Sequence, residues 1–160
     1  MARRSTKEDK NIYFLAREHK GYTREQASER IGYISADRIE KIENERIRPQ
    51  PDDVLAMATG YQDPYLCNHY CAQECPIGQK YTPKVEVKDV SQLTLELMVG
   101  LTKMNLLKDR LMEIVVDGKI SEEEQKDFET IREQLEQMSI AVEAMKLWIG
   151  QAETAKKLTN

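Results

Sequence analysis

Hydrophobic residues recur at helical spacing in five short segments of the first part of the chain, and each segment has start or stop signals at its ends. The first segment is predicted to run from a capping box at Ser5 to Gly21. Its inner residues are expected to be Ile12, Leu15 and Ala16. The fourth is predicted to begin near Asp52 and to end at Gly60, and the fifth to begin after Pro64. This part of the chain is therefore predicted to be all-α.

Residues 23–44 describe the second and third of these helices, joined by a tight turn. Thr23 is a good N-cap and completes a capping box with Gln26, three residues later. Gly32 lets the chain turn, and Ser35 supplies the next N-cap. The residues predicted to face the core are Ala27, Ile31, Ile39 and Ile42. Two short helices joined in this way are typical of a helix-turn-helix module that reads DNA.

Over roughly the first 65 residues the chain resembles the Cro/repressor-type (XRE family) regulators. The positions that carry the resemblance are Thr23, Ile31, Gly32, Ser35, Ile39, Ile42, Glu43 and Asn44. Arg46, Arg48 and Pro49 also fit the basic loop that follows the recognition helix in that family. The resemblance implies a five-helix lambda-repressor-like DNA-binding domain, and it implies a structural ion pair between Arg17 and Glu43.

The same resemblance implies a transcriptional regulator that binds double-stranded DNA with residues 35–44 in the major groove. The residues positioned to approach base edges would be Ala36, Asp37, Arg38 and Lys41. The residues expected to hold phosphates are Arg24, Asn44, Arg46 and Arg48. On this interpretation the protein distinguishes sequences through the first set and gains general affinity from the second.

Several positions depart from the family pattern. Ala27–Ser28 replaces the usual Leu-Ala, Glu45 replaces a glycine, and Tyr33–Ile34 stands where one residue is usual. Asp37 and Glu40 place carboxylates on the face that should approach DNA, where a carboxylate repels phosphate although it can accept from the cytosine amino group. These carboxylates favour an alternative function, a protein-interaction module that keeps the helix-turn-helix fold without using it on DNA.

All three cysteines lie in the fifth helix and just beyond it, at Cys67, Cys71 and Cys75. A spacing of four places consecutive thiols near one another on a helix, with a drift of about 40° per step. Three thiolates with an imidazole from His69 suit zinc, and Cys75 followed by Pro76 is similar to the end of some iron-sulfur motifs. His69 would join the thiols only if the helix breaks. Two other interpretations stay open, small buried hydrophobic residues and a redox-sensing Cys71–Cys75 pair.

An extended connector is predicted at residues 77–87, which closes a linker region (67–87) between the helix-turn-helix domain (1–66) and a C-terminal domain (88–160). The C-terminal domain is predicted to be a long antiparallel helical hairpin, with a turn at Asp117–Gly118 and a capping box at Ser121. Its first helix has seam residues Val90, Leu93, Leu97, Gly100, Met104, Leu107, Leu111 and Ile114. Its second has Phe128, Ile131, Leu135, Met138, Val142, Met145, Ile149 and Ala152.

Further apolar residues beside this coiled-coil-like seam predict a second interface on the hairpin. They are Leu95, Val99, Leu101, Leu106, Val115, Ile140, Leu147 and Trp148. We expect two hairpins to form a four-helix bundle in a homodimer. The alternatives are packing on the amino-terminal domain of the same chain and binding of a protein partner by the hairpin.

Charge is divided unevenly along the chain. Residues 1–50 hold 12 Lys or Arg and 9 Asp or Glu, and the remaining residues hold 12 and 19, so the two parts carry +3 and −7. A basic head on an acidic body fits a nucleic-acid-binding protein. No apolar run reaches membrane-spanning length and no signal peptide precedes the first helix, so we expect a cytoplasmic protein. Phosphate-binding glycine loops and nucleophile motifs are missing, and the protein is predicted not to be an enzyme.

Overall fold

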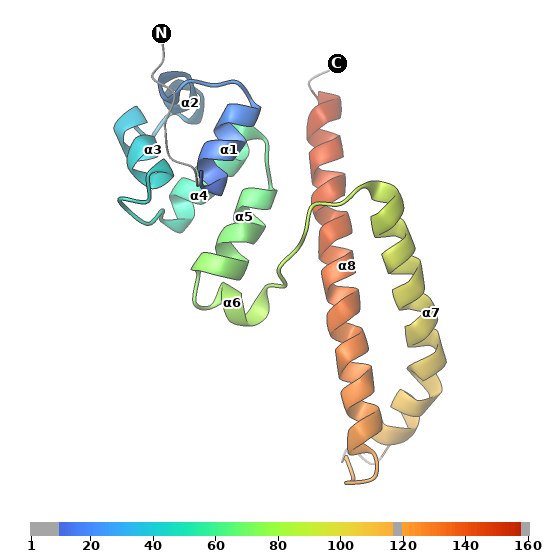
Figure 1. The fold of residues 1–160 in the computed structure, drawn as a ribbon. Coiled ribbons are helices and arrows are strands. Elements are labelled where there is room, and N and C mark those ends of the chain that lie inside the picture. The colour runs from blue at the N-terminus through green and yellow to red at the C-terminus, as the bar shows by residue number, and fades with distance from the viewer. Residues whose placement is uncertain (1–9, 117–119, 158–160) are drawn as a thin grey trace. The chain divides into compact units, whose positions relative to one another are not determined.

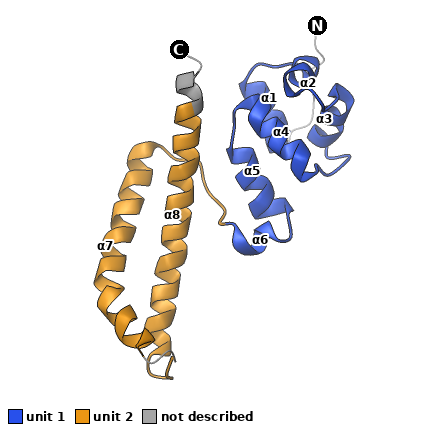
Figure 2. Cartoon of the chain, turned by 180° about the vertical axis from the view of Figure 1, so that it is seen from behind, with its two compact units in different colours: residues 1–82, 157–160 blue, residues 83–156 orange. Residues whose placement is uncertain are grey.

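The computed structural model of this chain describes residues 10–116 and 120–157, and every regular element within these ranges is a helix (Figure 1). The helices are α1 (Ile12–His19), α2 (Arg24–Ile31), α3 (Ala36–Glu43), α4 (Pro51–Tyr61), α5 (Tyr65–His69), the π-helix η1 (Tyr70–Glu74), α6 (Gly78–Tyr81), α7 (Val90–Val115) and α8 (Gln125–Lys157). The chain divides into two compact units, and the division falls between Thr82 and Pro83 (Figure 2). The predicted all-α fold, a five-helix domain followed by a helical hairpin, is confirmed.

Helix α1 begins at a different signal from the predicted one. Its N-cap is Asn11, whose side chain accepts a hydrogen bond from the backbone N–H of Phe14 (3.0 Å). The predicted cap at Ser5 lies outside the described residues. Tyr13 and Ala16 are buried, whereas Leu15, predicted to be inside, is exposed, because it lies on the opposite side of the helix from that pair.

The helix-turn-helix itself forms as the sequence predicts. The Thr23 hydroxyl accepts from the N–H of Gln26 (3.2 Å), and the Gln26 side chain accepts from the N–H of Thr23 (2.9 Å), which completes the capping box before α2. Gly32 turns the chain with φ +90°, and the Ser35 hydroxyl caps α3. Ile34 in the turn is buried, so the turn is tied to the core at its centre.

Helix α4 continues one residue past the predicted stop at Gly60, because the left-handed residue that ends it is Gln62 (φ +54°, ψ +47°). Gly60 instead lies against α2, where a Cβ at this position would be 2.7 Å from Cγ1 of Ile31. The glycine therefore permits the close approach of α2 and α4. At the other end, the Asp53 carboxylate accepts from the N–H of Gln50 (2.7 Å) and satisfies one free donor of the first turn.

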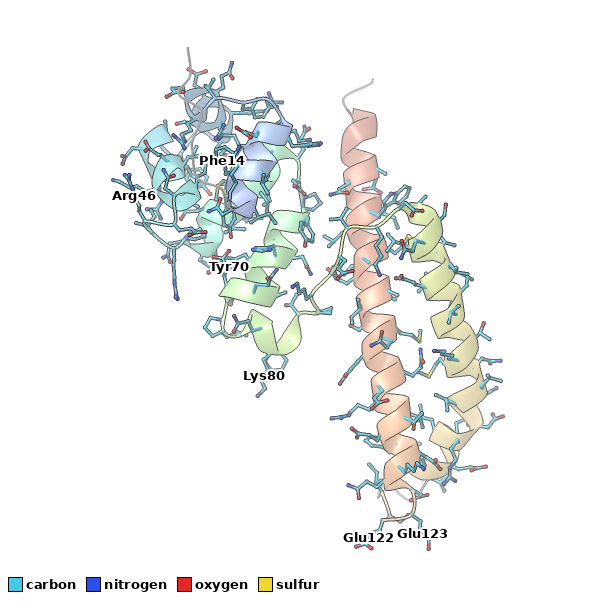
Figure 3. The ribbon with its side chains drawn as sticks, in the orientation of Figure 1. Phe14, Arg46, Tyr70, Lys80, Glu122 and Glu123 are labelled. Atoms are coloured by element: carbon cyan, nitrogen blue, oxygen red, sulfur yellow. The ribbon has the colours of Figure 1, made fainter. Side chains whose placement is uncertain are left out.

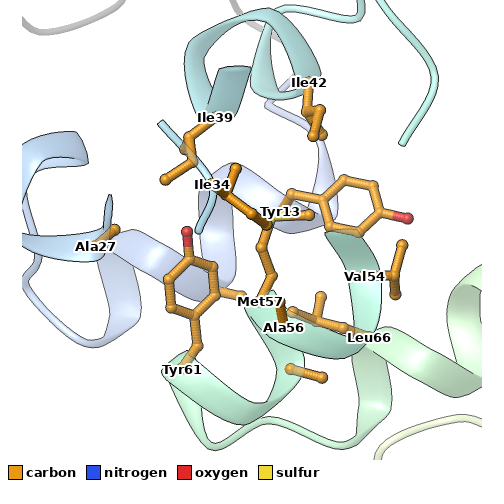
Figure 4. Close-up of a cluster of buried hydrophobic side chains, with 12 residues drawn as sticks. Tyr13, Ala27, Ile34, Ile39, Ile42, Val54, Ala56, Met57, Tyr61 and Leu66 are labelled. Atoms are coloured by element: carbon orange, nitrogen blue, oxygen red, sulfur yellow. The ribbon is translucent and has the colours of Figure 1, made fainter. Parts of the chain in front are cut away.

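The core of the first unit lies where α1 to α5 meet (Figure 4). Its buried side chains include Ala27, Ile39 and Ile42, which were predicted on the inner faces of α2 and α3, whereas the fourth predicted residue, Ile31, is only partly buried. The remainder come from the turn and from α1, α4 and α5. The buried members are Tyr13, Ala16, Ala27, Ile34, Ile39, Ile42, Val54, Ala56, Met57, Ala58, Tyr61 and Leu66. Each large aliphatic side chain removed from water in this way stabilises the fold by about 1.5–3 kcal/mol.

The second unit is an antiparallel hairpin in which α7 and α8 lie side by side (Figure 1). Asp89 caps α7, and the capping box between Ser121 and Glu124 precedes α8 (Glu124 N–H to the Ser121 hydroxyl, 3.3 Å). Arg110 on α7 donates to Asp127 on α8 (2.7 Å) and joins the two helices near the turn. The turn residues Asp117–Gly118 lie outside the described ranges. None of the described helices combines the length and the apolar character needed to cross a bilayer.

The register of α8 differs from the predicted seam. Leu135, Val142 and Ile149 are predicted to face α7, but they are exposed. Ala141 and Ala144 are buried instead. The three exposed residues share one position of the heptad, which lies beside the contact line. At the other predicted position Ile131 is buried and Met138 and Met145 are half-buried, so that half of the predicted seam does face α7. On α7 the seam prediction holds better, because of its eight predicted positions only Val90 is exposed.

Candidate nucleic-acid interface

A buried ion pair fixes α3 against α1. The Arg17 guanidinium donates from Nε to Oε1 of Glu43 (2.5 Å) and from Nη2 to Oε2 (3.0 Å), and the side chains are 8% and 0% exposed. Burial acts to lower the pKa of Arg17, but the hydrogen bonds to Glu43 and the nearby negative charges together outweigh it, and they raise the pKa above its usual value. This is the pair that the family resemblance implied, and it is confirmed. It sets where the recognition helix lies on the domain.

The outward face of α3 carries charges of both signs. Lys41 forms an ion pair with Asp37 one turn earlier (2.6 Å), and both side chains are in contact with water. Ala36 is half-buried at the start of the helix. Exposed pairs at this spacing contribute only about 0.3–0.5 kcal/mol, so Lys41 can leave Asp37 for another acceptor at little cost.

Arg38, which is predicted to approach base edges, forms an ion pair within the domain in the free protein. Its guanidinium makes two hydrogen bonds with the carboxylate of Asp53 at the start of α4, at 2.8 and 2.6 Å. The hydrogen bond from Arg38 holds the pKa of Asp53 below its usual value, and the same contact raises the pKa of Arg38. Arg38 therefore holds α3 to α4 in the free protein.

Arg24, predicted to hold phosphate, is also engaged within the domain. Its Nε donates to Oε2 of Glu43 (2.8 Å), and its Nη1 lies 4.0 Å from the carboxylate of Glu40. Asn44 is the C-cap of α3, and its backbone N–H donates to the carbonyl of Glu40. The Arg24 side chain therefore holds α2 to α3, whereas Asn44 contributes to α3 through its backbone.

The remaining two, Arg46 and Arg48, lie exposed in the loop between α3 and α4. Figure 3 labels Arg46 in this loop. Neither forms an ion pair with any residue that the structure describes. The loop leaves α3 through a Schellman turn, in which the N–H of Arg46 donates to the carbonyl of Lys41 (2.8 Å) and the N–H of Glu45 to that of Ile42 (3.0 Å). Glu45 has φ +57°, the left-handed conformation that favours glycine, which explains the glycine of the family pattern.

Sequence reasoning missed Tyr33. This exposed residue of the turn reaches α4, where its hydroxyl donates to the carbonyl of Asp52 (2.7 Å). The residue that makes the turn longer than the family pattern therefore ties it to the same end of α4 that Arg38 holds. In the sequence, the signal for this contact was an aromatic residue directly after the turn glycine, Gly32.

The helix that carries the cysteines changes form at His69. Beyond it Tyr70–Glu74 is π-helical and Cys75 is extended, so of the three thiols only Cys67 lies in the regular helix. All three thiols are free and half-buried, and burial raises the pKa of Cys67. Within the described residues no three His, Cys, Asp or Glu side chains are grouped as metal ligands.

His69 faces α1 rather than the thiols. Its Nδ1 lies 2.8 Å from the Gln73 amide nitrogen and its Nε2 lies 3.7 Å from the Glu74 carboxylate, which accepts a hydrogen bond from the hydroxyl of Tyr13 (2.6 Å). His69 and Glu74 also line a cavity of about 440 Å³ together with Arg48. The predicted ligand His69 is therefore part of a polar contact between η1 and α1.

The comparisons with known proteins agree with this geometry. A family model described as a helix-turn-helix domain matches residues 15–63, which span most of α1 and all of α2, α3 and α4. No curated protein and no solved structure matched the chain. The family model supports a helix-turn-helix of the DNA-binding kind, while the XRE assignment stays a resemblance. Residues 15–63 of this chain form a helix-turn-helix domain.

Proposed function

We propose that this protein is a sequence-specific DNA-binding transcriptional regulator that acts as a homodimer. One observation supports this function above the others: the buried pair between Arg17 and Glu43 fixes a recognition helix whose polar face is outward, and Arg46 and Arg48 lie unpaired beside it among the described residues. Guanidinium groups in such a position suit the phosphates that flank a helix in the major groove.

Each side chain has a distinct role in this proposal. Arg46 and Arg48 bind phosphates and supply affinity for any sequence, while Ala36, Asp37 and Lys41 approach base edges. Asp37 accepts from a cytosine amino group once Lys41 has left it for DNA. Arg24, Arg38 and Asn44 support the domain in its free state, and the two arginines reach DNA only by leaving Glu43 and Asp53.

Dimerisation rests on the exposed apolar residues of the hairpin. In the described part of α7 and α8, many large apolar side chains are in contact with water. Extensive exposed apolar surface of this kind marks an interaction site. The exposed members are Val90, Leu95, Met98, Val99, Leu101, Leu106, Met112, Val115, Leu135, Val142, Trp148 and Ile149. A second hairpin would cover part of this surface, and the dimer would then set the distance between two DNA half-sites.

Fluorescence anisotropy of labelled duplex DNA at several salt concentrations tests the DNA-binding role. Arg46→Ala removes one phosphate contact from each protomer, so the slope of log K against log salt should become shallower by about 1.8, which is about 0.9 for each contact. Affinity should fall on all sequences alike. Lys103→Ala removes an exposed cation from the hairpin and serves as the control with unchanged binding. No change in the slope for Arg46→Ala and Arg48→Ala would refute the assignment.

The alternative function is a protein-interaction module that keeps the fold without binding DNA. It is favoured by the ion pairs that occupy the cations of the recognition face, namely Lys41 with Asp37 and Arg38 with Asp53. Selection from random DNA separates the two functions, because a regulator enriches a defined site and an interaction module enriches none. The hairpin would then bind a protein partner.

A metal or redox input at the cysteines is a separate hypothesis. Zinc or an iron-sulfur cluster would need Cys67, Cys71, Cys75 and His69 to converge, which requires the segment after α5 to rearrange. Metal analysis of freshly purified protein, followed by melting with and without a chelator, tests this role. A metal-free protein with unchanged melting removes it, and DNA binding measured with and without reductant tests the redox form. We propose no catalytic role for any of these residues.

A further inference from the structure

A regular row of apolar side chains runs along α8, next to the side that faces α7. We name it the α8 stripe, and it consists of Leu135, Val142 and Ile149, which are 51%, 42% and 44% exposed. The members are seven residues apart, so they lie on one side of the helix. The side that faces α7 carries Ile131 and Ala141 instead, which are buried. The stripe therefore has the spacing of a coiled-coil seam and no partner helix within the described part of the chain.

Polar and charged residues flank this stripe in an ordered way. Four positions, each three residues before or four after a stripe residue, are Arg132, Ser139, Lys146 and Glu153. All four are exposed. The flank thus begins with a positive charge and ends with a negative one. Arg132 pairs within its own helix with Glu129, three residues earlier, and Glu153 has no ion pair among the residues whose side chains are described.

A seven-residue stripe can pair with its own copy in a limited number of registers. In an antiparallel pair centred on Val142, Leu135 of one copy lies opposite Ile149 of the other. The flanking positions then meet across the seam, and Arg132 lies beside Glu153 of the second copy. Shifting the pair by one heptad keeps the apolar residues in contact, but it sets Arg132 beside Lys146 of the second copy. Charges at such flanking positions set orientation and register in coiled coils.

A parallel pair of α8 helices does not bring the opposite charges of the flank together. It places the flanks of the two helices on opposite sides of the seam, where Arg132 of one copy does not reach Glu153 of the other. The apolar stripe alone does not distinguish these arrangements. Opposite charges meet only in the antiparallel register centred on Val142, and they meet twice, because a two-fold axis repeats every contact.

We propose that α8 pairs with α8 of a second copy of this chain in an antiparallel register centred on Val142, with Arg132 and Glu153 forming an ion pair at each end of the seam. The inference rests on the homodimer of the proposed function and names its interface. It also selects one face of the hairpin. A groove of about 420 Å³ lies elsewhere on the hairpin, is lined by Leu95, Val99 and Ile140, and contains no residue of the stripe or its flank.

Sedimentation of the full chain over a range of concentrations tests the interface. Val142→Glu should weaken the dimer by about 100-fold or more, because it buries a carboxylate at the two-fold axis. The exposed position of Val142 in the single chain leaves the hairpin folded, and the helical signal in circular dichroism checks this. Leu106→Glu is the matched control. Leu106 is exposed and lies in helical register with Leu95 and Val99, so it should leave the dimer intact.

Charge exchange tests the register. Arg132→Glu and Glu153→Arg should each weaken the dimer by about tenfold, because each replaces two attractive contacts with two repulsive ones. The double variant restores the pairs in reverse, and its dimer should return to within about threefold of the original. Loss of the local contact between Arg132 and Glu129 would not be repaired by a change at position 153.

The outcomes separate this interface from the homodimer itself. A dimer that survives Val142→Glu and is broken by Leu106→Glu places the interface on the other face and overturns the proposal, while the homodimer stands. A dimer that Val142→Glu breaks, but whose charge variants are not rescued by the double exchange, overturns the register. A monomer at all concentrations overturns both this interface and the homodimer, and leaves the DNA-binding role to be judged from the anisotropy.

Discussion

Glu43 is the residue on which the position of the recognition helix depends most. Its carboxylate accepts hydrogen bonds from Arg17 (2.5 and 3.0 Å) and from Arg24 (2.8 Å), and its side chain is fully buried. Glu43→Ala removes all three acceptor contacts. Arg17 is then left nearly buried with a positive charge and no carboxylate beside it, because its other contacts are the Tyr22 carbonyl (2.5 Å) and the ring of Phe14.

The expected cost follows from that geometry. Breaking a buried ion pair by removing one partner destabilises a protein by about 3–5 kcal/mol. The first unit, which has about 80 residues, has a total stability of roughly 4–12 kcal/mol. The change should therefore remove a large part of the stability of the first unit, and the midpoint of its thermal unfolding should fall by at least about 12 °C. DNA binding should be lost with it.

The chain offers a convenient way to assign the transition. Its single tryptophan is Trp148, which lies in α8 of the second unit. Tryptophan fluorescence therefore follows the hairpin, while far-ultraviolet circular dichroism follows both units. In Glu43→Ala the circular dichroism should show a new early transition, and the fluorescence transition should remain where it was.

A double variant checks the physical reason. Arg17→Met with Glu43→Leu removes both charges and keeps similar volumes, so it should cost markedly less than Glu43→Ala alone. The two single changes should also be strongly non-additive. If Glu43→Ala costs less than about 1 kcal/mol, or if the double variant is as unstable as the sum of its parts, the buried pair is not what holds α3 on the domain.

Three further predictions concern single contacts. Asp53→Asn should destabilise the first unit above pH 4. The difference in melting temperature from the original chain should vanish as the pH falls through the lowered pKa of Asp53, because protonation ends the pairing with Arg38. Melting curves from about pH 6 to about 2.5 check this. Glu45→Gly should raise the stability of the first unit by about 1 kcal/mol in urea unfolding, since it removes a left-handed non-glycine residue at φ +57°. Gly78→Ala should speed modification of the cysteines by a thiol reagent, because its Cβ would clash with the carbonyl oxygen of Cys71, and an unchanged rate would contradict the tight packing of α6 on η1.

Local signals in the sequence predicted the helix-turn-helix well. The capping box at Thr23, the cap at Ser35 and the apolar pairs of α2 and α3 all act within one or two turns of helix, so they can be identified without knowledge of the fold. The capping box at Ser121 before α8 was predicted from the same kind of signal. Where a competing local cap existed, as at Asn11 for α1, the choice between caps depended on packing that the sequence does not display.

The candidate site was harder to predict, because it depends on residues far apart in the chain. Arg38 and Arg24 look like DNA-binding cations in the sequence, but their partners Asp53 and Glu43 lie 15 and 19 residues further on. Arg46 and Arg48 have the same residue type and remain available. The two groups of arginines differ in whether a carboxylate from a distant part of the chain lies within hydrogen-bonding distance, and not in residue type.

By itself, the sequence determined the fold class, the helix-turn-helix and the presence of a long apolar repeat in the C-terminal half, because capping and periodicity are properties of neighbouring residues. Only the tertiary structure decided which cations stay free beside α3, how the chain changes form among the cysteines, and which face of α8 remains uncovered. Those features depend on ion pairs and helix contacts between distant segments, and small differences in helical phase decide them.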